Sequence, residues 1–162
     1  MMDNKLGYRE DYIMKEIEYF KLQAKNLFRD YKTKTPYIDN VTGYTFYKYS
    51  PKYFDIDEIF LTFDWDEEHF TLMNAQHLIA NIVGFNKWND LLKATPAQLK
   101  LAKLLFDNQD KIYLEEWEMY IAQIEKDNSI SLSDESKLEI FQKVFVEETG
   151  HQSYFPDFRL NH

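Results

Sequence analysis

The sequence predicts a mainly α-helical fold, arranged as a single-domain bundle of about six helices. Apolar residues recur every three or four positions along most of the chain, which is the spacing of one helix face. Glycine and proline have four copies each and 17% of the residues are aromatic, a composition typical of a compact folded chain. The 162 residues are enough for one core and too few for two domains. We therefore expect one helical domain over residues 1–162.

Residues 8–30 are predicted to form a long amphipathic N-terminal helix. Apolar residues follow the three- and four-residue spacing from Ile17 to Tyr31, while lysine, arginine and glutamate occupy the opposite face. Pro36 ends this region, because a proline pushes the residue before it out of helical geometry.

Residues 37–53 form a tyrosine-rich insertion whose composition differs from that of the predicted helices. Aromatic and β-branched residues favour an extended chain, and Asp39, Asn40 and Gly43 supply turn chemistry. The segment is either a small β-hairpin or an ordered loop. A lone two-stranded hairpin is marginal in water, so we expect a hairpin here to lie against the helices.

Residues 55–148 are predicted to form the helical body. Asp55 is placed to cap a short helix, a capping-box pattern begins at Thr95, and Ser133 starts the last helix. Residues 150–162 form a tail with three aromatic residues. That is too many for a free end, so we expect part of the tail to pack on the body.

The clearest sequence pattern in the body lies at 71–94, which predicts a helix, a helix end and a second short helix. Gly84 follows the last periodic apolar residue, where a left-handed conformation ends a helix without Cβ strain. Phe85 is then free to fold back onto the first helix, and Asn86 is expected to cap the second. Because large aromatic residues at helical spacing usually bury, we interpret Phe85 and Trp88 as core residues and not as a ligand platform.

The same stretch carries a resemblance to known proteins. The pattern consists of Asn74, Ala75, Ile79, Ala80, Gly84, Phe85, Trp88, Asn89 and Leu91. It resembles the small helical module of glyoxalase-related bacterial proteins, and together with LKLAKLLFDNQ at 99–109 it is similar to a family of uncharacterised bacterial proteins. The resemblance implies a shared helical fold and no catalytic residue. Glyoxalase chemistry belongs to a separate metal-binding β-rich domain, whose ligands have no counterpart here.

Charge and composition exclude several classes of function. A net charge of −9 makes a nucleic-acid backbone an unfavourable partner, because such binding relies on cations that neutralise phosphates. There is no cysteine for a disulfide or a thiolate site, and no window approaches the roughly 18 apolar residues of a membrane span. We therefore expect a cytosolic protein. Residues 55–68 contain seven acids and no base, which either orients a partner or keeps the surface soluble.

The candidate metal ligands are Asp64, Asp66 and His69, with His77 farther along the chain. Carboxylates at alternate positions beside a histidine suit a divalent cation. The spacing is neither that of an EF-hand loop nor that of a His-Glu-x-x-His helix. The alternative is an acidic approach to the helix that begins near Thr71, where carboxylates favour the positive end of the helix dipole. His77 is either a hydrogen-bonded boundary residue or a ligand.

No enzyme signature stands out, since the sequence has no glycine-rich phosphate loop, no nucleophile elbow and no dinucleotide fingerprint. We expect no cofactor. The leading hypothesis is a non-enzymatic protein-binding or adaptor module, because exposed tyrosines are typical of interfaces. Tyr44, Tyr47, Tyr49 and His77 are its candidate binding residues.

Two alternatives come from other classes. One is a metal-dependent enzyme built on the acids and histidines between Asp64 and His77. The other is an acidic protein that imitates nucleic acid and occupies a basic partner through residues 55–68.

Overall fold

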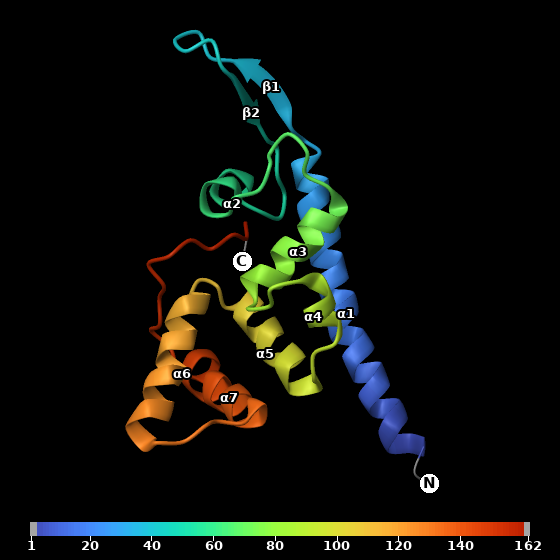
Figure 1. Cartoon of the computed structure of the whole chain (residues 1–162), viewed down its shortest axis with the longest axis vertical. Helices are drawn as coiled ribbons and strands as arrows, with labels where there is room; N and C mark the ends of the chain where they lie inside the picture. The colour runs from blue at the N-terminus through green and yellow to red at the C-terminus, as the bar shows by residue number, and fades with distance from the viewer. Residues whose placement is uncertain (1–2, 161–162) are drawn as a thin grey trace.

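The computed structural model describes the backbone of residues 3–160 and the side chains of residues 15–160. The ends of the predicted domain, 1–2 and 161–162, lie outside the described residues. Within them the chain is mainly helical, with seven α-helices and one small hairpin, which confirms the predicted fold class (Figure 1).

The helices and strands follow one another in a simple order. They are α1 (Asp3–Tyr31), β1 (Thr35–Ile38), β2 (Thr45–Lys48), α2 (Ile56–Thr62), α3 (Leu72–Ile82), α4 (Trp88–Leu92), α5 (Pro96–Asp107), α6 (Leu114–Asn128) and α7 (Asp134–Phe141). A single π-helical turn, Gln142–Glu147, continues α7. The N-terminal helix therefore begins five residues before the predicted residue 8. Within residues 3–160, no helix combines the length and the apolar composition needed to cross a membrane.

The core has two parts that meet at α5. The larger part lies between α1, α3 and α5 and contains the fully buried Phe20, Leu78 and Phe106. The smaller part lies between α5, α6 and α7 and is built around Trp117 and Phe141. Figure 1 shows α5 in the middle of the body, with α1 on one side and the α6–α7 pair on the other.

The helix–stop–helix prediction for 71–94 is confirmed in its main features. Gly84 has a φ of 97°, in the left-handed region, and the Phe85 amide donates to the Ala80 carbonyl oxygen at 2.9 Å. A Cβ on Gly84 would lie 3.3 Å from Leu114, so the site is also crowded. Phe85 packs against the larger core and Trp88 is buried within it, as expected for structural residues.

The predicted cap of α4 at Asn86 is wrong. The capping position is Lys87, and its side chain makes no capping hydrogen bond. The backbone amide of Trp88 donates instead to Nδ1 of His77, at 3.1 Å. The imidazole of the preceding helix thus replaces the side chain of an N-cap residue. The carbonyl oxygen of Asn86 accepts a hydrogen bond from Nδ2 of Asn81 at 3.0 Å.

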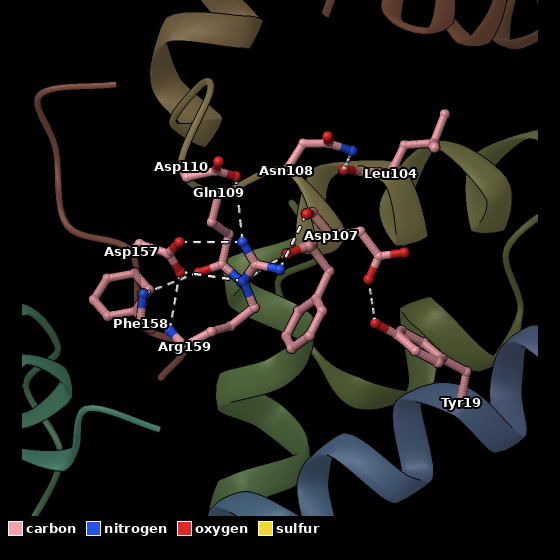
Figure 2. A network of polar contacts seen from close by, with 10 residues as sticks. Tyr19, Leu104, Asp107, Asn108, Gln109, Asp110, Asp157, Phe158 and Arg159 are labelled. Atoms are coloured by element: carbon pink, nitrogen blue, oxygen red, sulfur yellow. Dashed lines mark hydrogen bonds and ion pairs between the residues drawn. The ribbon is translucent and has the colours of Figure 1, made fainter. Parts of the chain in front are cut away.

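The C-terminal tail packs on the body, as predicted for residues up to 160. Phe158 is buried in the larger core and its amide donates to Oε1 of Gln109 at 3.2 Å. Arg159 donates through Nη1 to the carbonyl oxygen of Asp107 at 3.0 Å and pairs through Nη2 with Asp157 at 3.1 Å. Figure 2 shows this network closing over the end of α5. The tail is therefore held against the larger core and the end of α5.

Candidate protein-binding surface

The tyrosine-rich insertion is a β-hairpin and not a loop. Its strands pair antiparallel, with Tyr37 opposite Phe46 and Pro36 opposite Tyr47. The first strand starts at Thr35, two residues before the predicted insertion. The expectation that the hairpin lies against the helices is wrong for most of its length, because it projects beyond the helical body (Figure 1).

The turn of the hairpin is closed by local hydrogen bonds. Oδ2 of Asp39 accepts from the amide of Thr42 at 2.9 Å and from its hydroxyl at 2.7 Å. Gly43 has a φ of 75°, a conformation in which a side chain would be strained. These are turn residues of the kind the sequence indicated.

The base of the hairpin is anchored to α1 by a buried carboxylate. Asp30 is 1% exposed, and it accepts from the backbone amides of Lys52, Tyr53 and Phe54 at 3.0, 2.7 and 2.9 Å. The amide of Ser50 donates to the side chain of Thr33 at 2.8 Å. The chain that leaves the hairpin is thereby fixed against the end of α1, which explains how an otherwise marginal two-stranded unit is held.

A second anchor involves Glu67, in the acidic stretch. Its carbonyl oxygen accepts from the Tyr31 hydroxyl at 2.7 Å and from Lys34 Nζ at 3.1 Å. Its carboxylate oxygen Oε1 accepts from the Tyr49 hydroxyl at 2.6 Å. Burial is the main cause of a raised pKa at Tyr49, and this hydrogen bond adds to it, so the phenol stays protonated at neutral pH.

The part of the hairpin beyond these anchors exposes large apolar side chains. Val41 is 92% exposed and Tyr44 is 68% exposed, and Ile38, Tyr37 and Phe46 are exposed as well. Such residues are normally scattered on a protein surface, whereas five of them lie here within ten residues of sequence. The hairpin is therefore an apolar surface on a projecting element.

A groove of about 320 Å³ lies between the hairpin and α2. We call it the hairpin groove, and its lining consists of Tyr37, Phe46, Tyr47, Asp57, Phe60, Leu61 and Glu67. Its walls are thus mainly aromatic, with one carboxylate from α2 and one from the segment after it. Leu61 is 81% exposed, which extends the apolar surface of the hairpin onto α2.

The stretch 55–68, which contributes Asp57 and Glu67 to the groove, is acidic. No carboxylate of residues 55–68 forms an ion pair with a lysine or arginine within the described part of the chain, and Asp66 pairs only with His69. Two cations lie over rings of the hairpin, Lys34 Nζ at 4.4 Å from the centre of Tyr47 and Lys48 Nζ at 4.8 Å from the centre of Tyr37.

The structure separates the four predicted binding residues. Tyr44 lies exposed near the tip of the hairpin, and Tyr47 lines the groove. Tyr49 packs into the body, where its ring stacks on Phe60 with centroids 6.4 Å apart. His77 lies on α3, where its ring accepts the first amide of α4, so it joins none of the hairpin tyrosines in this surface.

The candidate metal ligands are brought together only in part. Nδ1 of His69 lies 2.8 Å from Oδ2 of Asp66, and both side chains are exposed. The hydrogen bond from His69 lowers the pKa of Asp66. Among the residues whose side chains are described, no group of three or more histidine, aspartate or glutamate side chains is arranged to hold a metal ion. Asp64 adds no third ligand, so the metal prediction gains no support.

A smaller cavity, of about 160 Å³, lies beside the tail network (Figure 2). Asp107 contributes a carboxylate there, but both of its oxygens are occupied. One accepts from the Tyr19 hydroxyl and the other from Lys103 Nζ at 2.7 Å. Burial and Asp107 raise the pKa of Tyr19, which keeps this hydroxyl protonated. The arrangement stabilises the packing of α1 on α5 and supplies neither a free base nor a nucleophile.

Sequence reasoning missed most of the groove. Tyr37 and Phe46 belong to the predicted insertion, but they became recognisable as a pair only through the register of the strands. Asp57 and Leu61 are four residues apart on α2, which places them on one face of a short helix. The available signal was the helical spacing, because the inward positions Ile56 and Ile59 leave these two residues on the outer side of this helix.

A scan against protein-family models and searches among curated proteins and solved structures find no significant match to this chain.

Proposed function

We propose that this chain is a non-enzymatic, cytosolic protein-binding module, and that the hairpin and the outer face of α2 form its contact surface. The observation that carries the proposal is the cluster of exposed apolar residues on a projecting, anchored hairpin. Tyrosine and phenylalanine are enriched at protein interfaces because they bury a large area at a small cost in conformational entropy.

The anchoring of the hairpin supports the same role. A flexible loop loses conformational freedom when it binds, and this loss weakens affinity. Here the turn is closed by Asp39, and the base is held by Asp30 and Glu67. The exposed rings of the hairpin are thus presented on a backbone that is already ordered. Among the described residues the sheet has only these two strands, so the outer edge of each offers backbone hydrogen bonds to an extended segment of a partner.

Site-specific photo-crosslinking tests the proposal. A photoreactive phenylalanine analogue replaces Tyr44, and a matched control carries it in place of Met119, an equally exposed apolar residue on α6. We expect a protein from the organism that encodes this chain to be crosslinked at Tyr44 and not at Met119. The crosslinked protein is then purified and its affinity for the full chain is measured by calorimetry.

The same calorimetric measurement uses a hairpin variant in which Ile38, Val41 and Tyr44 are serine. We expect its dissociation constant to rise by about tenfold or more, because clustered apolar contacts dominate interface energies. Circular dichroism and urea unfolding verify that the variant folds. Equal crosslinking at both positions, or unchanged affinity of the hairpin variant, would refute the proposed surface.

A further inference from the structure

We propose that the hairpin groove receives an arginine-containing basic segment of the protein partner. This inference rests on the proposed function and specifies the chemistry of the partner. It is carried by two independent features of the groove, the carboxylates of Asp57 and Glu67 in its lining and its aromatic walls.

The charge is the first step. Residues 55–68 place seven carboxylates on and beside α2, with no lysine or arginine among them. Asp57 lines the groove and is exposed, and its carboxylate forms no hydrogen bond or ion pair with the described part of the chain. Like charges crowded on one surface repel one another, and a cationic segment relieves that repulsion on binding. Of these seven carboxylates, those of Asp57 and Glu67 line the groove, and Lys34 and Lys48 lie over two of its rings. The acidic stretch as a whole outnumbers these two lysines.

The aromatic walls are the second step. A cation is attracted to the face of an aromatic ring, and the chain already uses this interaction at both Tyr37 and Tyr47. Each of those rings has a lysine over one face. Phe46 is exposed and has no lysine or arginine over its ring within the described residues. It gives the groove a further face on which a cationic group can stack.

Arginine fits these features better than lysine does. Its planar guanidinium stacks on a ring and presents two parallel donors to a carboxylate, whereas an ammonium acts as a point charge. Asp57 lies in the same groove as the rings, and neither of its carboxylate oxygens has a hydrogen-bond partner in the described part of the chain. Glu67 also lines the groove. Its Oε1 holds Tyr49, and its Oε2 has no hydrogen-bond partner in the described part of the chain.

Fluorescence anisotropy with a labelled hexa-arginine peptide and the full chain tests the inference. We expect saturable binding that weakens between about 50 and about 300 mM NaCl, because salt screens exposed charges. The Asp57→Asn variant should bind about fivefold more weakly, the effect of losing one exposed charge contact. A Phe46→Ser variant, at an exposed position, should also weaken binding.

The matched control is Glu135→Gln. Glu135 is an exposed acid in the first turn of α7, as Asp57 is in the first turn of α2, so both changes remove one charge from an equivalent helix position. We expect the control to bind like the wild type. A hexa-lysine peptide should bind more weakly than hexa-arginine. Equal weakening by both substitutions, or equal affinity for the two peptides, would overturn the inference, since either result indicates attraction by net charge alone.

The failure of this inference differs from the failure of the proposed function. If hexa-arginine does not bind while the Tyr44 crosslink to a partner persists, the hairpin is a contact surface whose partner has another chemistry. Sedimentation velocity adds the remaining outcome. A concentration-dependent dimer that Leu61→Ser dissociates would place a second copy of the chain in the groove, and would overturn the basic segment.

Discussion

Replacing Asp30 by alanine is expected to destabilise the protein more than any other single change at the hairpin. Its carboxylate accepts three backbone amides at 2.7–3.0 Å and is 1% exposed, so the substitution removes three hydrogen bonds to one charged acceptor. Hydrogen bonds to charged groups contribute about 1.5–3 kcal/mol each. The Phe54 amide is buried and gains no replacement, whereas the amides of Lys52 and Tyr53 are only partly buried and recover some hydration.

We therefore expect the free energy of unfolding to fall by about 3–4 kcal/mol, which is less than the sum of three such bonds. For a chain of this length that corresponds to a fall in Tm of roughly 10 °C. Urea unfolding measures the change directly. Asp30→Asn keeps one acceptor oxygen in the same volume, so its free energy of unfolding should lie between that of the wild type and that of Asp30→Ala. The reasoning would be refuted by an alanine variant that unfolds within about 1 kcal/mol of the wild type.

Three further predictions concern the helical body. Gly84→Ala should lower the free energy of unfolding by about 1–2 kcal/mol, because φ is 97° and the added Cβ meets Leu114. Gly43→Ala is strained but uncrowded, so it should cost less in the same urea unfolding measurement. An equal cost for the two variants would contradict the role of Leu114. His77→Ala should cost about 1 kcal/mol as a lost cap of α4, with partial rescue by His77→Asn; a cost shared by both variants would point to packing instead. Burial raises the pKa of Glu16, so folding at pH 7 places an ionised carboxylate where its charge is disfavoured. Glu16→Gln should therefore raise the free energy of unfolding at pH 7. Urea titrations at a low pH, where the wild-type carboxyl is protonated in both the folded and the unfolded state, should show no such gain.

The helical part of the fold was predictable because its signals are local. The cap of α3 at Thr71, the capping box at Thr95 and the cap of α7 at Ser133 each depend on residues within one turn of helix. The stop at Gly84 is equally local, since a left-handed residue is needed wherever that helix ends. These positions could be read without knowing what packs on them.

The groove was not predictable, because it depends on contacts between distant residues. The hairpin is oriented by Asp30, which the sequence offered only as the end of a helix, and its partners lie more than twenty residues away. The prediction that Asn86 caps α4 was wrong for the same reason. His77, eleven residues from the amide that it accepts, reaches that amide only because α3 and α4 pack together. Tyr49 likewise became an anchor only through Glu67.

Glu67 occupies a position where recognition and stability compete. Oε1 of Glu67 holds the Tyr49 hydroxyl at 2.6 Å, and the same carboxylate lines the groove proposed for an arginine. A substitution there would loosen the base of the hairpin and remove a charge from the groove at once, so loss of binding would not distinguish the two effects. The carboxylate of Asp57 lies in the same groove without a hydrogen bond to the described part of the chain, so removing its charge leaves the anchors intact. Recognition of a cation can therefore be measured at Asp57 separately from stability, whereas an effect at Glu67 alone says only that the hairpin must be held in place.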